Sequence, residues 1–385
     1  MASWPSLYVV STYPPRLCGL ATFAYDLASA LAQGRGEELG EGGSVSVVAL
    51  DERRRRPYGG EVCTVVRTSK LEDYVAAAEL VNESAGATVS LQHEYGIFGG
   101  RVGRYVLNFL ERVRKPVVTT LHTVLAEPKP RQRDILIKVC ERSAAVVVMA
   151  EKAAEFLTRS YGVPGEKVHV VHHGTPDVTF ADPAPFKKAL GVEGRKIVLT
   201  FGLISPRKGV QVAIRALADV LPQFPDSLYI ILGATHPSIK KRYGEAYRAS
   251  LQQAIDRLGL HDHVRFVNRF VSLGELLTYL RATDVYVTPY LNEDQISSGT
   301  LAYAVACGKA IVSTPYWYAR ELLGDDRGVL VPFRDWRTLA FWFTNLLAHD
   351  GARRYLGRRA YRFGRRMTWA KSAAAYERLF RQVAR

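Results

Sequence analysis

Sulfur-containing residues are scarce in this chain of 385 residues, which has four cysteines and three methionines. The cysteines, at positions 18, 63, 140 and 307, are scattered along the sequence. They lack the close pairing that structural zinc sites and disulfide scaffolds require. We therefore expect reduced thiols and no metal site built from cysteine.

Long hydrophobic runs are also missing. No run of apolar residues is long enough to cross a bilayer, although 48% of the residues are apolar. The first residues, MASWPSLYVVSTYPP, lack the basic flank and the apolar core of a cleavable signal peptide. With 23% charged residues, the composition is that of a soluble globular protein. We expect a cytoplasmic protein, with the inner face of the membrane as an alternative location.

Acidic residues are in the minority, and 52 lysines and arginines against 37 aspartates and glutamates give a net charge of +15. The positive charge is concentrated at residues 53–56 and 353–366. We favour a solvated, arginine-rich face as the explanation. Peripheral contact with an anionic membrane surface stays open as an alternative. Nucleic acid is not an expected partner, because the basic runs lack interleaved aromatic residues and a known nucleic-acid-binding module.

The chain is too long for one ordinary hydrophobic core, so the sequence predicts two domains. Short apolar runs alternate with helical patterns in both halves, which is typical of α/β domains with doubly wound parallel sheets. The expected helices include residues 74–82, 102–113, 210–221 and 300–307. The expected strands are residues 7–12, 45–50, 88–92, 117–121, 145–149 and 168–171 in the first half and 196–201, 228–233, 264–267, 284–288, 310–314 and 328–331 in the second.

A burst of prolines at residues 181–186 (ADPAPF) marks the expected domain boundary. We predict a first domain at residues 1–180 and a second at residues 181–366. A C-terminal segment at residues 367–385 has the pattern of an amphipathic helix.

The most informative stretch combines a strand at residues 284–288, a polar loop at residues 291–298 and a helix that begins near Gly299. Open α/β sheets bind ligands at the carboxyl ends of their strands, where this loop lies. Free backbone N–H groups of Ser298, Gly299 and Thr300 would face an anion there. The stretch predicts a phosphate-bearing ligand, and a nucleotide in particular.

Arg207 and Lys208 form a second phosphate signal. They follow the strand at residues 196–201 and stand directly before the helix at residues 210–221. Two cations and a helix N-terminus would converge there on one anion. As surface charges alone the two residues would be unremarkable, so the prediction depends on their position before the helix.

Polar clusters follow three strands of the first half. A loop at residues 13–19 follows the first strand, residues 92–95 (QHEY) end another, and His122 follows VVTTL. A histidine and a glutamate at adjacent strand ends could orient a sugar or transfer a proton. A lone histidine is more often a packed, hydrogen-bonded residue, and both interpretations stay open.

Three stretches resemble motifs of retaining glycosyltransferases of family four, which have the GT-B fold. They are GLISPRKG at residues 202–209, VHHGTPD at residues 171–177 and YAVACGKAIVST at residues 303–314. The resemblance covers essentially the whole chain. It implies two Rossmann-like domains that face a central cleft, the first binding the acceptor and the second binding a nucleotide-sugar donor. It also implies that residues 367–385 form a helix that crosses back to the first domain.

By this resemblance, Lys208 matches the lysine that binds the donor diphosphate, and His122 falls where many members place a histidine beside the transferred sugar. Gly19 matches the glycine of a first loop that lies near the donor phosphates. The predicted catalytic residues are His122, Arg207, Lys208 and Glu293. The predicted donor-binding residues are Gly19, Leu20, Gly202, Gln295, Ser297, Ser298, Gly299, Thr300 and Tyr303. The predicted acceptor-binding residues are Arg16, His93, Glu94 and Tyr95.

The sequence departs from the family pattern at two places. The family arginine in G-R-L is Leu203 here, so Arg207 would supply the second cation. The usual Glu-x7-Glu pair aligns with Gln295 and Tyr303. Gln295 could still hydrogen-bond sugar hydroxyl groups, with Glu293 compensating nearby. Tyr303 could meet the nucleotide ribose only through its phenol or by packing.

The resemblance implies transfer of a hexosyl unit, mannose or glucose, from a nucleotide sugar such as GDP-mannose or UDP-glucose to a sugar or lipid-linked acceptor with retention. No cofactor and no metal are expected, because cations and helix N–H groups can stabilise a leaving phosphate. The chain also lacks the Asp-x-Asp sequence of the metal-dependent alternative fold. A non-catalytic nucleotide-sugar-binding protein and a sugar-nucleotide epimerase or hydrolase of the same fold stay open as alternatives. The oligomeric state is not indicated.

Overall fold

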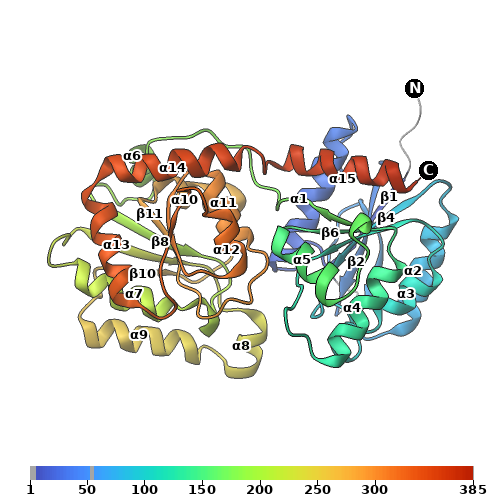
Figure 1. The fold of residues 1–385 in the computed structure, drawn as a ribbon, viewed down its shortest axis with the longest axis horizontal. Coiled ribbons are helices and arrows are strands. Elements are labelled where there is room, and N and C mark those ends of the chain that lie inside the picture. The colour runs from blue at the N-terminus through green and yellow to red at the C-terminus, as the bar shows by residue number, and fades with distance from the viewer. Residues whose placement is uncertain (1–5, 53–55, 385) are drawn as a thin grey trace. The chain divides into compact units, whose positions relative to one another are not determined.

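The computed structural model describes residues 6–52 and 56–384 and divides the chain into two compact units. Unit 1 comprises Met1–Gly174 and Thr368–Arg385, and unit 2 comprises Thr175–Met367. Each unit has its own parallel sheet with helices packed against it (Figure 1). The predicted class, α/β with two doubly wound parallel sheets, is confirmed. Residues 53–55 of the predicted basic run lie outside the described residues.

The sheet of unit 1 has seven strands in the order β3-β2-β1-β4-β5-β6-β7, and each neighbouring pair is parallel. Its inner strands are buried along nearly their whole length because both faces of a parallel sheet are covered. The strands are β1 (Leu7–Ser11), β2 (Val45–Asp51), β3 (Val62–Arg67), β4 (Thr88–His93), β5 (Val117–Leu121), β6 (Ala145–Val148) and β7 (Val168–Val170). The helices are α1 (Gly19–Gly34), α2 (Leu71–Glu83), α3 (Val106–Arg112), α4 (Pro130–Arg142), α5 (Glu151–Ser160) and α15 (Trp369–Val383).

The sheet of unit 2 repeats this topology with six parallel strands in the order β10-β9-β8-β11-β12-β13. The strands are β8 (Lys196–Phe201), β9 (Ser227–Leu232), β10 (Val264–Val267), β11 (Val285–Thr288), β12 (Ala310–Ser313) and β13 (Val329–Leu330). The helices are α6 (Ala184–Ala189), α7 (Val210–Val220), α8 (Pro237–Tyr243), α9 (Ala246–Leu258), α10 (Leu273–Ala282), α11 (Gly299–Ala306), α12 (Trp317–Leu322), α13 (Trp336–Ala348) and α14 (Asp350–Gly364). The side chains of α7 and α13 form one core cluster with the central strands, in which Leu217, Val287 and Phe343 are fully buried.

The predicted strands are all present, and two local features differ from the prediction. β3 was not predicted because it lies at the edge of the sheet, where only Val66 is buried and Cys63 is exposed. The helix expected at residues 102–113 begins only at Val106. Val102 lies inside a short 3-10 segment at Arg101–Gly103 and has a φ of 60°, which interrupts the helical backbone there.

In each sheet, the first strand in sequence lies between the second and the fourth, so the chain changes direction across the sheet beside β1 in unit 1 and beside β8 in unit 2. Ligands of doubly wound sheets bind outside the carboxyl ends of the strands at such a switch point. The loops that follow β1, β4 and β5 in unit 1, and β8 and β11 in unit 2, are therefore the places to look for a site.

Helix α15 belongs to unit 1 although it ends the chain. It packs against α1, and its Glu377 forms an ion pair with the buried Arg35 at 3.1 Å. The Tyr376 and Thr120 hydroxyl groups are 2.8 Å apart, so α15 is also bound to the end of β5. No helix in the described part of the chain has the length and apolar character needed to cross a membrane.

Unit 2 begins before the proline-rich stretch that marked the expected boundary at residue 180. The Tyr361 hydroxyl group donates to the Val178 carbonyl at 3.0 Å, and the rings of Tyr361 and Phe180 are 5.4 Å apart. The residues that precede the prolines therefore pack within unit 2.

The Arg35–Glu377 pair predicts a large effect of one substitution. The side chain of Arg35 is 1% exposed and that of Glu377 is 15% exposed, so Glu377→Ala would leave a buried guanidinium without its carboxylate. We expect unit 1 to lose about 3–5 kcal/mol of unfolding free energy, measured by urea denaturation with amide hydrogen exchange of unit 1 peptides. Arg381→Ala is the control, because its exposed pair with Glu377 contributes less than about 1 kcal/mol. Equal losses in the two variants would contradict the prediction.

Candidate functional site

Two loops of unit 2 approach each other so closely that only glycine fits at their contacts. Gly209 has a φ of 65°, and a Cβ atom there would lie 1.8 Å from the Pro289 carbonyl oxygen. Gly202 has a φ of 123°, and a Cβ atom there would lie 2.9 Å from the Thr300 methyl group. The Leu291 N–H group also donates to the Arg207 carbonyl at 3.0 Å. The loop after β8 is therefore fixed against the loop after β11.

This contact places Lys208 in a chain of hydrogen bonds. Its ammonium group donates to the Tyr290 hydroxyl at 2.6 Å and lies 3.8 Å from the centre of that ring. The Tyr290 hydroxyl is 3.1 Å from the Thr300 hydroxyl, which is 3.1 Å from the hydroxyl of Ser298. The Tyr290 ring stacks on Tyr316 with centroids 4.8 Å apart. Lys208 is thus oriented by a rigid, buried aromatic pair.

The charge of Lys208 changes the acidity of its neighbours. Burial alone would raise the pKa of Tyr290, but the adjacent Lys208 ammonium group and hydrogen bonds with Thr300 and Ser298 together lower it. Burial and the charge of Lys208 together lower the pKa of His236, which follows β9 on the same edge of the sheet. A neutral imidazole and a polarised phenol therefore accompany the cation.

The N-terminus of α11 lies at the same edge. The Ser298 hydroxyl caps the helix by accepting a hydrogen bond from the Leu301 N–H group. Within the described part of the chain, the N–H groups of Gly299 and Thr300 have no hydrogen-bond acceptor. Such free N–H groups at a helix start attract anions. The predicted anion-binding features, Lys208 and the start of α11, are thus brought together.

Other predicted residues of unit 2 lie around this cluster without joining its hydrogen bonds. Arg207 is exposed, and the Glu293 carboxylate lies 3.7 Å from Arg320. Gln295 is exposed, and its side-chain amide donates to the Ser297 carbonyl at 2.6 Å. Tyr303 is 6% exposed, and its ring lies 6.5 Å from that of Phe201. Arg207 follows β8, Glu293 and Gln295 precede α11, and Tyr303 lies within it, and the roles assigned to these residues stay predictions.

In unit 1, the ends of β4 and β5 hold two polar pairs. The His122 ring donates from Nε2 to the Gln92 side chain at 2.9 Å, and the Gln92 amide donates to Ser90. The Thr123 hydroxyl donates to the Glu94 carboxylate. Burial lowers the pKa of His122, with a contribution from neighbouring histidines, and burial raises the pKa of Glu94. His122 is therefore neutral near pH 7.

Phe23 of α1 is the centre of the packing behind His122. Its ring meets the His122, His173 and Trp369 rings edge-on, at centroid distances of 4.7, 5.0 and 5.2 Å. A Cβ atom on Gly174 would lie 2.0 Å from the Trp369 ring. The HHG turn after β7 therefore supports the His122 edge of unit 1 by packing.

His93 and Tyr95 differ from their predicted role as acceptor contacts. His93 is fully buried between the Tyr95 and Phe98 rings, at centroid distances of 5.2 and 5.8 Å. Tyr95 is 9% exposed, and its hydroxyl group donates to the Gln132 carbonyl of α4 at 3.1 Å. Both side chains belong to the core of unit 1, so the geometry gives them a packing role.

The loop after β1 presents the remaining predicted residues. Gly19 begins α1, is exposed and has open space around it, and Leu20 beside it is half-buried. The Cys18 thiol caps the helix by accepting from the Ala21 N–H group at 3.4 Å. Arg16 is half-buried and lies 4.0 Å from Glu52. The loop thus leaves the α1 N-terminus accessible.

The comparisons with known proteins agree with this arrangement. Residues 18–177 match the family model "Glycosyltransferase Family 4", and residues 183–363 match "Glycosyl transferases group 1". A D-inositol 3-phosphate glycosyltransferase of Xylanimonas cellulosilytica is 31% identical over 295 residues, which are 71% of this chain and 68% of that protein. The chain belongs to glycosyltransferase family 4. Its general activity is therefore glycosyl transfer.

A further relative supports this glycosyltransferase assignment, and two solved structures show the fold. A phosphatidyl-myo-inositol mannosyltransferase of Mycolicibacterium smegmatis is 25% identical over 278 residues, 71% of this chain and 67% of that protein. HepE of Anabaena in complex with UDP superposes with a TM-score of 0.77 at 16% identity, covering 98% of this chain and 100% of that one. Sucrose-phosphate synthase of Thermosynechococcus elongatus has a TM-score of 0.79 at 18% identity, with 98% and 99% covered. The glycosyltransferase thus has the GT-B fold.

Three residues of the glycosyltransferase sites were missed by the sequence prediction. Gln92 orients His122, Tyr290 orients Lys208, and His236 lies within the electrostatic reach of Lys208. Each follows or ends a strand at the carboxyl edge of its sheet. That position was the available signal. Gln92 directly precedes His93, which was selected, and Tyr290 lies three residues before Glu293, which was also selected.

Burial of His93 predicts a pH-dependent stability. Burial lowers the pKa of His93 to about 4, whereas an unfolded histidine titrates near 6.5. Between these values only the unfolded chain binds the proton, so unit 1 loses stability as the pH falls, by about 1.4 kcal/mol per pH unit. His93→Leu should reduce the slope of unfolding free energy against pH by that amount between pH 6 and 4.5. An unchanged slope in His93→Leu would refute the prediction.

Proposed function

We propose that the enzyme transfers a hexosyl unit from a nucleotide sugar to a sugar or lipid-linked acceptor, with retention and without a metal ion. The observation that carries this proposal is the Lys208 cluster beside the free N–H groups of α11. Family membership supports transfer of a glycosyl group, and the similarity to HepE, whose structure is a complex with UDP, supports a nucleotide. Mannose and glucose are the favoured sugars.

The proposed chemistry follows from where charge develops. Breaking the sugar–diphosphate bond places negative charge on the leaving phosphate. A cation fixed in advance by Tyr290, together with the N–H groups at the start of α11, would stabilise this charge without reorganising during the step. Arg207 is exposed beside Lys208 and would add a second cation to the bound diphosphate.

The residues that replace the family glutamate pair would bind the donor differently. Gln295 is exposed and could rotate to hydrogen-bond sugar hydroxyl groups, because its present acceptor is only the nearby Ser297 carbonyl. Tyr303 is buried beside Phe201 and would shape the ribose pocket by packing. Glu293 would compensate for the missing carboxylate only after leaving Arg320.

The polar edge of unit 1 is the proposed acceptor site. A neutral His122 held by Gln92 can orient an acceptor hydroxyl group, and Glu94 can accept a hydrogen bond from another. The names of two relatives contain inositol, which makes a cyclic polyol, free or in a lipid, the first acceptor to test. Contact with an anionic membrane stays part of the proposal for a lipid-linked acceptor.

The loss of the glutamate pair at Gln295 and Tyr303 favours one alternative. A non-catalytic protein that binds a nucleotide sugar would keep Lys208 and the start of α11 but would not turn over. A sugar-nucleotide epimerase or hydrolase would release product without an acceptor. Product analysis with and without acceptors separates all three functions.

A screen of GDP-, UDP- and ADP-sugars tests the donor assignment. Thermal unfolding of the full chain is followed with each nucleotide sugar, in EDTA and in magnesium. One nucleotide should raise the melting temperature equally in both conditions. The absence of a shift with every donor would overturn the proposal, and a shift only with magnesium would overturn its metal independence.

Lys208→Ala tests the residue that carries the proposal. Loss of a charge-assisted phosphate contact should cost about 1.5–3 kcal/mol, or roughly a 10- to 150-fold loss of donor affinity or kcat/KM. The exposed Lys241→Ala is the matched control and should behave as the wild type. Affinity and turnover that are unchanged in Lys208→Ala would refute the assignment.

A further inference from the structure

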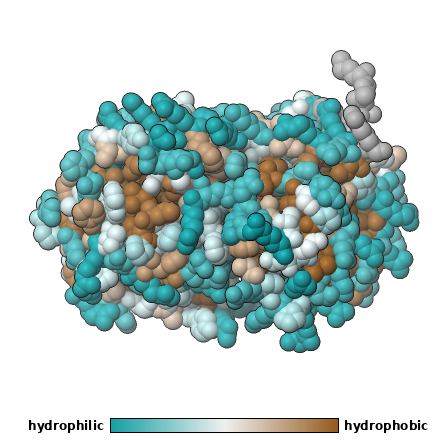
Figure 2. Space-filling model, viewed as in Figure 1, coloured by the Kyte–Doolittle hydropathy of each residue, from teal (hydrophilic) through white to brown (hydrophobic). Residues whose placement is uncertain are grey.

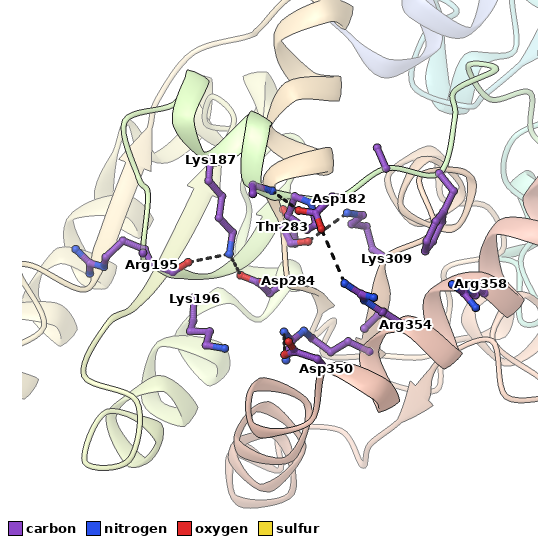
Figure 3. Close-up of a pocket in the computed structure, with 18 residues that line it drawn as sticks. Asp182, Lys187, Arg195, Lys196, Thr283, Asp284, Lys309, Asp350, Arg354 and Arg358 are labelled. Carbon is purple, nitrogen blue, oxygen red and sulfur yellow. Dashed lines mark hydrogen bonds and ion pairs between the residues drawn. The ribbon is translucent and has the colours of Figure 1, made fainter.

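A cavity of about 550 Å³ opens within unit 2 at the amino-terminal edge of its sheet (Figure 3). Its wall includes Lys196, the first residue of β8, Asp284, which precedes β11, and Ala310, the first residue of β12. The Lys208 cluster follows the carboxyl ends of β8 and β11 instead. The cavity and the proposed donor site therefore lie at opposite edges of one sheet.

Three aspartates in the wall are each matched by a cation. Asp284 binds the Lys187 ammonium group at 2.6 Å and also accepts from the Ile197 N–H group. Asp350 pairs with Arg353, and Asp182 lies 3.9 Å from Arg354. The carboxylates of the wall are thus already neutralised by the protein's own side chains.

Seven basic residues line the cavity, so the positive charge exceeds these pairs. Arg195 is directed away in Figure 3 and donates to the carbonyls of Asp226, Ser227 and Asp262. This leaves Lys196, Lys309 and Arg358, for which the described residues provide no carboxylate within ion-pair distance. The charges of Asp350 and Asp284 still reach Lys196 and Lys309, respectively, although each of these carboxylates is already paired with another cation.

Lys309 is the strongest indication that the cavity is built for an anion. Lys309 is 5% exposed, and its ammonium group donates to the Arg281 and Thr283 carbonyls at 3.1 and 3.2 Å. An ammonium group has three donors, and two carbonyls do not neutralise its charge. Burial lowers the pKa of Lys309 to about 8, so the cation is retained at neutral pH only at a cost that a bound anion would offset.

We propose that this cavity is a second ligand site, which binds a small phosphate-bearing polyanion through Lys196, Lys309 and Arg358. Three cations from β8, the start of β12 and α14 surround one concave surface, where converging positive charge raises the local concentration of anions. The volume exceeds that of a single phosphate group, so a diphosphate or a phosphorylated sugar fits the size and the charge. Arginine and lysine donors suit phosphate oxygen atoms.

Inorganic diphosphate is the probe, and the full chain carrying Lys208→Ala is the background, in which the proposed donor site is expected to bind roughly 10- to 150-fold more weakly. Isothermal titration of this variant should show one binding site for diphosphate. Adding Lys196→Ala and Arg358→Ala should weaken that binding at least tenfold. Adding Arg257→Ala instead, at an exposed arginine of α9 outside the cavity wall, should change it less than twofold.

Two results would overturn the proposal: no diphosphate binding in the Lys208→Ala chain, or equal weakening by the cavity variants and the Arg257→Ala control. Arg358→Lys keeps the charge and should keep affinity within about threefold, which separates loss of the site from loss of folding. A donor-affinity loss in Lys208→Ala with intact diphosphate binding would show that the two sites are independent.

A lipid headgroup and a free phosphate compound share this chemistry. Sedimentation with vesicles that contain phosphatidic acid distinguishes these sources. Vesicle binding that is lost in the Lys196→Ala/Arg358→Ala variant and displaced by diphosphate would assign the site to a headgroup. Diphosphate binding in solution without vesicle binding would assign it to a soluble ligand.

Discussion

The close approach of two backbone segments in unit 2 determines the geometry of the proposed donor site. Gly209, in a left-handed conformation, allows the loop after β8 to pass directly against the Pro289 carbonyl of the loop after β11. A side chain at this position would separate the loops, and Lys208 would then lose its 2.6 Å contact with Tyr290. The backbone contact between Gly209 and Pro289 therefore determines where the Lys208 ammonium group lies. Lys208 belongs to the loop after β8, and Tyr290, which accepts its hydrogen bond, belongs to the loop after β11.

The fold could be predicted because most of its strands are short runs rich in apolar residues. Such runs indicate a parallel sheet that is covered on both faces. β8 (Lys196–Phe201) and β5 (Val117–Leu121) were predicted with their observed ends for this reason. β3 shows where the signal fails. An edge strand has a neighbouring strand on one side only. Most residues of VCTVVR are therefore half-exposed, and the segment does not stand out as a buried apolar run as its neighbours do. The break at Val102 likewise has no signature in the apolar periodicity. It lies close to Gly99, where a Cβ atom would be 1.5 Å from the Thr68 carbonyl oxygen.

The sequence was sufficient to place the candidate sites at the carboxyl edges of the two sheets. It was not sufficient to identify every side chain that forms them. Successive residues of a strand point to opposite faces, so either Gln92 or His93 could have met the end of β5. The structure directs Gln92 to His122 and buries His93 among aromatic rings. The role of Tyr290 was ambiguous in the same way, because an aromatic residue after a strand can either pack in the core or bind a cation. Resolving such choices requires the register of neighbouring strands, which a single sequence does not contain.

The structure explains part of the high positive charge of the chain, namely the arginines of α14, which composition alone cannot do. Hydrophilic side chains cover α14 (Figure 2), as a solvated arginine face would. Yet Arg353 donates to the Leu347 carbonyl and Arg359 to the Asp325 carbonyl at 2.8 Å, so several of these arginines bind the ends of neighbouring segments. Arginine suits this task because its planar group reaches more than one acceptor. Arg358 has no such partner among the described residues and lines the cavity, so its charge stays available to a ligand there.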